Sequence, residues 1–176
     1  CHMGQLDKID ALFNEIKRRH GRLDILVNNA ATNPHFGEMT GIDEGAWNKT
    51  FEVNVKGPFF LIQKAAGLMA ASGGGAIVNV ASVNGVKPAP MQGVYSITKA
   101  AVISMTKAYA KELARHKIRV NALLPGLTET KFAGALFTND AIYKYALQGI
   151  PLNRHAQPEE MAGAVLYLVS DASSFT

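Results

Sequence analysis

The sequence predicts an α/β protein with a doubly wound parallel sheet, in which helices cover both faces and give three α/β/α layers. Three short apolar runs, at 23–27, 76–80 and 118–124, are typical of strands that are buried on both faces. Longer segments with helical periodicity separate these runs, and such alternation favours parallel strands joined by right-handed crossovers. In a sheet of this kind the ligand crevice lies at the carboxyl ends of the strands.

Length and composition indicate a single globular domain over residues 1–176. Hydrophobic residues make up 48% of the chain and charged residues 18%, which suits one sizeable core. The cations behind the net charge of +4 are largely scattered, so we expect no nucleic-acid surface. No apolar run reaches about 18 residues, so we expect no membrane span. The single cysteine, Cys1, excludes an internal disulfide framework and fits a reducing, cytoplasmic location.

The first predicted helix covers residues 6–20 and leads into the first strand. Apolar side chains recur there at the spacing of one helix face: Ile9, Leu12, Phe13 and Ile16. Gly21 is a suitable C-terminal cap. The strand at 23–27 then delivers three residues into a loop: Asn28, Asn29 and Ala30. They either approach a ligand or tie the loop to neighbouring strands.

The second predicted helix begins at Asp43, with Asp43 or Thr40 as its N-cap. Large apolar residues at intervals of four predict one buried face: Trp47, Phe51, Val55 and Phe59. Asn54 lies beside that face and needs hydrogen-bond partners, because an unsatisfied buried amide costs about 1–3 kcal/mol. Gly57-Pro58 interrupts or kinks this helix.

The stretch 76–99 combines a strand, a loop and a helix into a candidate site. Ser82 stands at the end of the strand, while Tyr95 and Lys99 share one face of the following helix, about 6 Å apart along its axis. A nearby lysine cation lowers the pKa of a tyrosine, which then becomes a usable general acid or base. A bare Tyr-x-x-x-Lys pattern also occurs by chance on helix surfaces. The preceding strand and Ser82 favour the functional interpretation.

The last third of the chain begins with a strand at 118–124, and Pro125-Gly126 turns its end. Thr128 and Thr130 follow, either as N-caps of a helix that starts at Lys131 or as ligand contacts. An aromatic-bearing stretch occupies 132–149. Pro158 and two glutamates then mark the first turn of the last helix.

In these motifs the sequence resembles the short-chain dehydrogenase/reductase family over nearly its whole length. Ser82 matches the family's serine, and Thr130 its usual threonine. Four further matches are Tyr-x-x-x-Lys at 95–99, Asn-Asn-Ala-Gly at 28–31 with Ala in place of Gly, Asn-x-x-Gly at 54–57, and Pro-Gly at 125–126. The similarity of 1–3 and 33–37 to the carbonyl-reductase branch is fainter and names no substrate.

The resemblance implies a Rossmann-like oxidoreductase that transfers a hydride between NAD or NADP and a secondary alcohol or carbonyl. It implies that Tyr95 is the acid/base, that Lys99 lowers its pKa and binds the ribose, that Ser82 positions the substrate oxygen, and that Asn54 holds a relay water. Cofactor contacts are implied for Asn28, Asn29, Ala30, Tyr95, Lys99, Pro125, Gly126, Thr128 and Thr130. The region 132–149 would be the substrate lid, no metal would be bound, and the protein would form a homodimer or homotetramer.

The ends of the chain depart from the family pattern. The glycine-rich Thr-Gly-x-x-x-Gly-x-Gly turn and the last strand are missing, so we expect residues 1–176 to be the C-terminal two-thirds of a longer enzyme. Two alternatives stay open. A sugar-nucleotide epimerase or dehydratase of the extended branch also uses Tyr-x-x-x-Lys, with a larger C-terminal domain. A non-catalytic module would instead pair with full-length subunits through the helices at 43–71 and 95–115.

Overall fold

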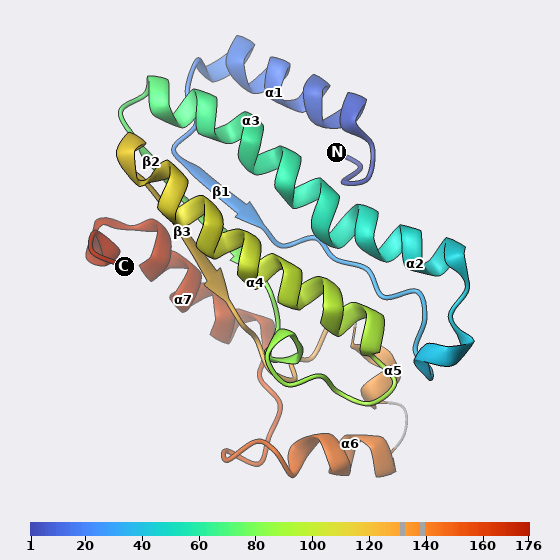
Figure 1. Ribbon diagram of the computed structural model, residues 1–176. Helices are drawn as coiled ribbons and strands as arrows, with labels where there is room; N and C mark the ends of the chain where they lie inside the picture. The colour runs from blue at the N-terminus through green and yellow to red at the C-terminus, as the bar shows by residue number, and fades with distance from the viewer. Residues whose placement is uncertain (131–132, 138–139) are drawn as a thin grey trace.

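A computed structural model describes residues 1–130, 133–137 and 140–176, which form an α/β structure in three layers (Figure 1). Three parallel strands make the sheet, in the order β1 (Ile25–Asn28), β2 (Gly75–Val80) and β3 (Ile118–Leu123). Leu26 lies opposite Ile77, and Ile77 lies opposite Val120. The predicted fold class is confirmed.

Helices lie on both sides of this sheet (Figure 1). On one side are α1 (Leu6–His20), α3 (Gly57–Ala71) and α4 (Gly93–Leu113), and on the other is α7 (Pro158–Val169). The short helices α2 (Glu44–Phe51), α5 (Gly134–Phe137) and α6 (Asp140–Leu147) lie toward the end of the molecule where α4 begins. The strands also end on that side, so residues at their carboxyl ends can meet there.

Local sequence signals set several helix ends. The backbone of Gly21 is left-handed and its N–H donates to Lys17, which ends α1 as predicted. The carboxylate of Asp43 accepts the N–H of Ala46 at 2.7 Å, so Asp43 is the N-cap of α2. Pro158 lies in the first turn of α7, where its missing N–H costs nothing.

The core lies between the sheet and the layer of α1, α3 and α4. Its largest fully buried side chains are apolar and come from helices and strands alike: Ile9, Ile62, Met69, Ile77 and Ile118. Burying a side chain of this size stabilises the fold by about 1.5–3 kcal/mol. This packing fixes the strand ends relative to α4.

Arg119 of β3 fastens α7 to the other side of the sheet. Its guanidinium donates to the carbonyl oxygens of Leu168 and Ser170 and to the hydroxyl of Ser173. Carbonyl groups at a helix C-terminus lack partners within the helix, so a cation supplied by the sheet both satisfies and attracts them.

The first strand is less buried than the sequence predicts. Ile25 and Val27 are 46% and 39% exposed, whereas Asn28 is buried. The prediction that this strand is covered on both faces is therefore wrong at two positions. β1 is at the edge of the three described strands, and α7 packs against β2 and β3.

The prediction of a buried face along Trp47, Phe51, Val55 and Phe59 is wrong at Trp47 and Phe59, whereas Phe51 and Val55 are half-buried. Trp47 and Phe59 are 38% and 41% exposed, and Trp47 stacks on Phe51 with ring centroids 4.6 Å apart.

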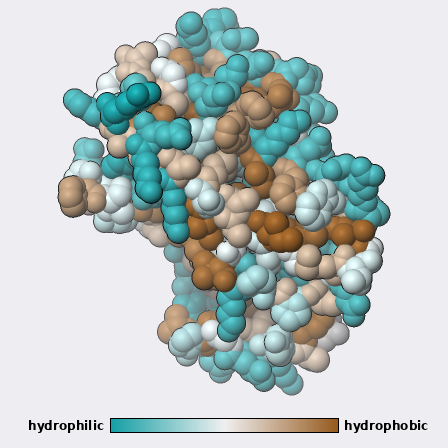
Figure 2. Space-filling model, viewed as in Figure 1, coloured by the Kyte–Doolittle hydropathy of each residue, from teal (hydrophilic) through white to brown (hydrophobic). Residues whose placement is uncertain are grey.

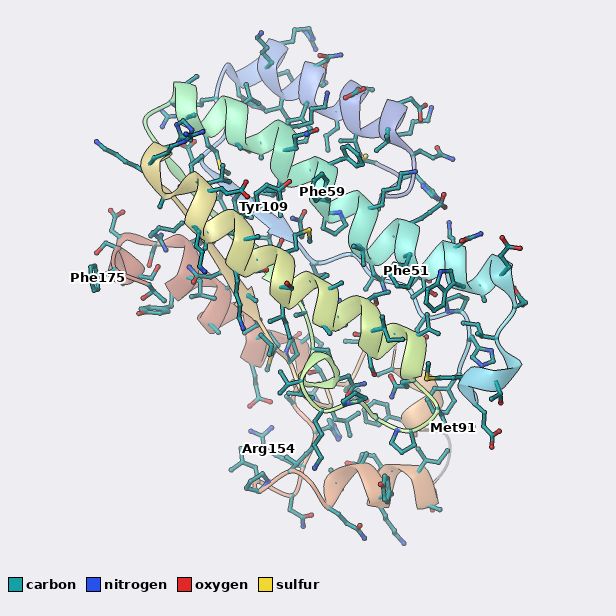
Figure 3. The ribbon with its side chains drawn as sticks, in the orientation of Figure 1. Phe51, Phe59, Met91, Tyr109, Arg154 and Phe175 are labelled. Atoms are coloured by element: carbon teal, nitrogen blue, oxygen red, sulfur yellow. The ribbon has the colours of Figure 1, made fainter. Side chains whose placement is uncertain are left out.

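A π-helical turn at Glu52–Lys56 joins α2 to α3 and changes the helical phase. Buried side chains in this stretch include those of Thr50, Val53, Asn54 and Leu61. Apolar side chains thus remain on the surface of the α3–α4 side (Figure 2), where Phe59 packs on Tyr109 (Figure 3).

The loop after β2 packs tightly on α4 at Gly85. A Cβ atom at this position would lie 2.7 Å from the carbonyl carbon of Lys99 and 2.8 Å from Cδ1 of Ile103. Neither backbone nor a packed side chain can give way cheaply at such distances. Glycine is therefore required for the loop that begins at Ser82 to reach the helix that carries Lys99.

We predict that Gly85→Ala lowers the free energy of unfolding by about 1–3 kcal/mol, the usual cost of an overpacked contact. Chemical denaturation measures the difference. Gly67→Ala is the matched control, because a Cβ at Gly67 on α3 meets no atom within 4 Å. Equal stabilities of the Gly85→Ala and Gly67→Ala variants would contradict the described packing.

Candidate active site

Tyr95 and Lys99 lie one turn apart at the start of α4 and are both buried. The ammonium nitrogen of Lys99 is 5.5 Å from the centroid of the Tyr95 ring. It donates a hydrogen bond of 2.7 Å to the carbonyl oxygen of Val80, the last residue of β2. The predicted proximity of the two side chains is therefore present, and the lysine also joins α4 to the sheet.

Burial lowers the pKa of Lys99 to about 8. The side chain is only 3% exposed, and removing an ammonium from water disfavours its charged form. Of its three donor hydrogens, the described residues account for one, through Val80. The site thus holds a cation that has donors to offer a ligand.

Burial raises the pKa of Tyr95, although a hydrogen bond with Ser82 acts in the opposite direction. The expectation from the sequence that Lys99 lowers the pKa of Tyr95 is therefore wrong. Desolvation of the phenolate outweighs the hydrogen bond. Tyr95 is consequently a neutral phenol near pH 7.

Ser82 meets Tyr95 from the end of β2, as the sequence predicts. The residue caps the short turn Val83–Gly85, and its hydroxyl oxygen accepts the N–H of Asn84 at 3.1 Å. Together with the Tyr95 contact, this bond fixes the hydroxyl of Ser82 at the carboxyl end of β2. A serine held in this way can hydrogen-bond the same substrate oxygen as the phenol.

Asn54 lies in the π-helical turn, where its side chain ties three segments together. Its amide oxygen accepts the N–H of Thr32, and its amide nitrogen donates to the carbonyl oxygen of Thr32 and to the hydroxyl of Thr98. Thr98 in turn donates to the carbonyl oxygen of Tyr95 at 2.7 Å. Asn54 is thus a satisfied buried amide that braces the Tyr95 turn, with both amide hydrogens in use.

Asn28 closes β1 with a buried side chain. Its amide nitrogen donates to Oδ1 of Asn79 at 2.8 Å, and Asn79 donates to Thr106. Among the described residues, nothing hydrogen-bonds to Oδ1 of Asn28. An unsatisfied buried oxygen is rare and suits a site that a ligand completes. Asn29 and Ala30 follow at the exposed start of the loop.

The turn after β3 lies beside the Ser82 loop, because the carbonyl oxygen of Pro125 accepts the N–H of Val83 at 3.1 Å. Gly126 is exposed, and the hydroxyl of Thr128 donates to its carbonyl oxygen. The hydroxyl of Thr130 accepts the N–H of Ala133, one residue before α5 begins at Gly134. A helix start at Lys131 lies outside the described residues.

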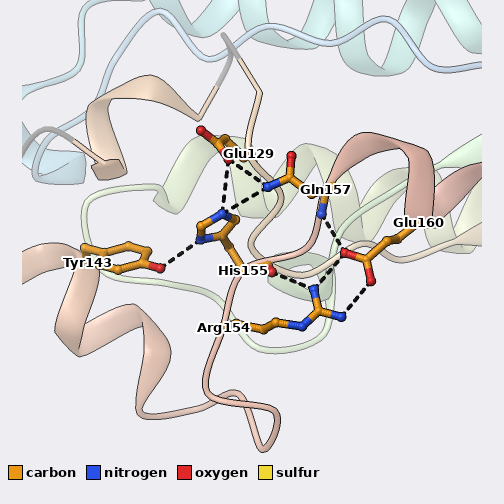
Figure 4. A network of polar contacts seen from close by, with 6 residues as sticks. All are labelled: Glu129, Tyr143, Arg154, His155, Gln157 and Glu160. Atoms are coloured by element: carbon orange, nitrogen blue, oxygen red, sulfur yellow. Dashed lines mark hydrogen bonds and ion pairs between the residues drawn. The ribbon is translucent and has the colours of Figure 1, made fainter.

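An open hollow of about 510 Å³ adjoins this turn, and its lining includes Glu129, Thr130, Phe137 and Gln157. Beside it His155 contacts Tyr143 and Glu129, while Arg154 pairs with Glu160 (Figure 4). None of these contacts was predicted from the sequence. Its members are spread from Glu129 to Glu160 over loops and helix ends, where no periodicity or motif marks them.

Two properties of the described residues concern metal binding and membrane crossing. Within the described ranges, no group of three or more His, Cys, Asp or Glu side chains is placed to hold a metal ion. None of the described helices has the length and the apolar character that a bilayer crossing needs.

Comparisons with known proteins agree with the fold. A family model described as enoyl-(acyl carrier protein) reductase matches residues 1–176. The structure is similar to that of a gluconate 5-dehydrogenase from Burkholderia cenocepacia in complex with NADP and tartrate, with a TM-score of 0.96 and 32% identity over 100% of this chain and 69% of the other. It is also similar to that of an NAD+-bound xylitol dehydrogenase, with a TM-score of 0.92 and 27% identity over 100% of this chain and 73% of the other.

Sequence relatives point the same way. The chain is 38% identical over 175 residues to dehydrogenase/reductase SDR family member 4 of Oryctolagus cuniculus, covering 99% of this chain and 67% of the relative. The same protein of Mus musculus is 37% identical, and the chain spans 63% of its length. The 3-oxoacyl-[acyl-carrier-protein] reductase FabG of Thermotoga maritima is 40% identical over 96% of this chain and 68% of the relative. The chain belongs to the short-chain dehydrogenase/reductase family.

Proposed function

We propose that the protein is an NAD(P)-dependent oxidoreductase that interconverts a secondary alcohol and a carbonyl compound. One observation carries this proposal. Ser82, Tyr95 and Lys99 converge at the carboxyl end of β2, where a hydroxyl, a phenol and a buried ammonium can act on one substrate. These groups supply proton transfer and orientation, which is what a protein adds to nicotinamide chemistry.

The residues present fit a dinucleotide cofactor. Lys99 has donor hydrogens beyond the one that Val80 accepts, and Oδ1 of Asn28 lacks a partner among the described residues. The ammonium would bind ribose hydroxyl oxygens, and the loop of Asn28, Asn29 and Ala30 would approach the adenosine part. Pro125, Gly126, Thr128 and Thr130 would hold the nicotinamide end. When bound, the nicotinamide ring supplies or accepts the hydride.

The protonation states favour carbonyl reduction near neutral pH. Burial keeps Tyr95 as a phenol, which can donate its proton to a carbonyl oxygen as the negative charge develops. Ser82 orients that oxygen by a second hydrogen bond. Lys99, charged below about pH 8, stabilises the tyrosinate that the proton transfer leaves behind.

Asn54 contributes by bracing this site. Its links to Thr32 and Thr98 fix the turn from which Tyr95 projects. In the proposed proton relay Asn54 holds a water. Because both amide hydrogens of Asn54 are in use, the water would donate to an oxygen of this residue, either Oδ1 or the backbone carbonyl oxygen.

The proposed substrate class is broad, and the relatives suggest the probes. Gluconate and xylitol with oxidised cofactor test the polyol reaction that two of the similar structures are named for. An acetoacetyl thioester with reduced cofactor tests the reaction that the Thermotoga relative is named for. Turnover of any one probe supports the proposal, and each reaction is followed with NAD and with NADP.

Assembly and location are part of the same proposal. The exposed Trp47, Phe59 and Ile97 lie on α2, α3 and α4, and they would be covered in a homodimer or homotetramer. The single cysteine fits a cytoplasmic enzyme. Light scattering of the purified protein would measure the mass of the assembly.

We predict that Tyr95→Phe lowers turnover by about 10²–10⁴-fold, since the general acid is lost while the ring remains. Cofactor affinity, measured by nicotinamide fluorescence, should change little. Tyr167→Phe on α7, which removes an exposed hydroxyl, is the matched control. Turnover of Tyr95→Phe within a few-fold of the wild type would overturn the catalytic assignment.

A second prediction concerns the charge of Lys99. The lowered pKa means that the ammonium loses its proton as the pH rises through about 8, so the wild-type reduction rate should fall there. Lys99→Arg should weaken cofactor binding and turnover, because a planar guanidinium does not fit a site built for a compact ammonium. Its residual rate should lack the fall near pH 8, since arginine stays charged.

Lys107→Arg, at an exposed position of the same helix, serves as the control for the lysine experiment. Unchanged cofactor fluorescence titrations for Lys99→Arg would show that Lys99 does not bind the ribose. A rate that is flat through pH 8 in the wild type would contradict the role of the charged ammonium.

A further inference from the structure

His155 is the centre of the polar network beside the hollow (Figure 4). Its Nδ1 lies 2.8 Å from the hydroxyl of Tyr143 on α6, and its Nε2 lies 3.1 Å from Oε2 of Glu129 in the loop after β3. The ring of Phe137 meets the imidazole edge-to-face, with centroids 5.2 Å apart. One side chain thus joins α5, α6 and the loop between Thr128 and Thr130.

The hydrogen bonds of His155 with Tyr143 and Glu129 have a consistent direction, and the amide nitrogen of Gln157, 3.2 Å from Nε2, donates to Glu129 instead. In the neutral imidazole, Nε2–H donates to the carboxylate of Glu129, so Nδ1 is free to accept the hydroxyl hydrogen of Tyr143. Gln157 donates to the same carboxylate at 2.8 Å, and the backbone pairing of Thr128 with Ala156 holds the two loops in register.

The neighbouring side chains of Arg154 and Glu160 pair with each other and not with the imidazole of His155. Arg154 makes two hydrogen bonds to the carboxylate of Glu160, which also accepts the N–H of Gln157. Those bonds hold the pKa of Glu160 near 2, so the carboxylate remains an acceptor for Arg154. Gln157 likewise lowers the pKa of Glu129, with a smaller contribution from His155.

We infer that His155 is a positioning residue that fixes α6 and Phe137 against the Thr128–Thr130 loop and thereby sets the affinity of the enzyme for its substrate. This inference rests on the proposed function. Phe137, Thr130 and Glu129 line the hollow, and two of them contact His155 directly. α5 and α6 lie toward the end of the molecule where α4 begins (Figure 1), and Tyr95 is in the first turn of α4.

The expected kinetic effect falls on KM. Loss of the histidine contacts lowers the fraction of molecules in which α6 is in place, and apparent affinity scales with that fraction. Saturating substrate restores the competent arrangement, so kcat changes little. His155→Leu, which removes both hydrogen bonds, should raise KM about three- to tenfold and leave kcat within about twofold, with whichever of gluconate, xylitol or the acetoacetyl thioester the enzyme turns over.

A double-mutant comparison tests the coupling. Tyr143→Phe removes only the hydroxyl that faces Nδ1 and should raise KM in the same direction. The double variant Tyr143→Phe/His155→Leu should be no worse than His155→Leu alone, because both changes break one chain of contacts. Tyr145→Phe is the matched control, since Tyr145 is on the same helix and is 63% exposed.

Hydrogen exchange gives a readout that needs no turnover. Backbone amides of α6 should exchange faster in His155→Leu and Tyr143→Phe than in the wild type or Tyr145→Phe, while those of α4 stay unchanged. Faster exchange in α6, combined with no binding of NAD or NADP in nicotinamide fluorescence titrations and no turnover of any probe by the wild type, would refute the proposed function and leave the histidine contact established. Unchanged exchange in α6, or kcat and thermal stability that fall together at constant KM, would overturn the inference about His155.

Discussion

The hydrogen bond from the Lys99 ammonium to the carbonyl oxygen of Val80 is the interaction on which the rest of the site depends. It joins the first turns of α4 to the end of β2 at 2.7 Å. Taking an ammonium out of water costs several kcal/mol. One charge-assisted hydrogen bond contributes about 1.5–3 kcal/mol and does not offset that cost. The result is a lysine whose pKa falls to about 8 and of whose three donor hydrogens Val80 takes one.

Neighbouring groups keep this arrangement in place. Gly85 lets the loop after Ser82 touch the backbone of Lys99, and Thr98 links the carbonyl of Tyr95 to Asn54. Asn54 reaches across to the loop of Thr32, which follows β1. Loops from two strand ends and the π-helical turn therefore converge on the first two turns of α4. A polar network that is satisfied in this way specifies a single geometry.

Local signals in the sequence were sufficient for much of this structure. Gly21, Asp43 and Pro158 mark helix ends through their own backbone preferences and hydrogen bonds. Ser82 follows a predicted strand and Tyr95 begins the next helix, so the rule that ligands bind at the carboxyl ends of parallel strands identifies both as site residues. The exposure of Trp47 was not predictable, because a π-helical turn changes the helical phase without a clear sequence mark. The pKa of Tyr95 depends on desolvation by tertiary packing. His155 meets Glu129 from 26 positions away, in segments with no periodicity.

The most direct test of this account is the pKa of the Lys99 ammonium in the protein without cofactor. Nuclear magnetic resonance of lysine side chains labelled at the ε position follows each ammonium through its titration, and the spectrum of Lys99→Arg identifies the signal. The account predicts a midpoint near pH 8 for this lysine. A midpoint near 10.4, the ordinary value for lysine, would show that the ammonium is not held in a desolvated site beside Tyr95, and would contradict the proposed mechanism.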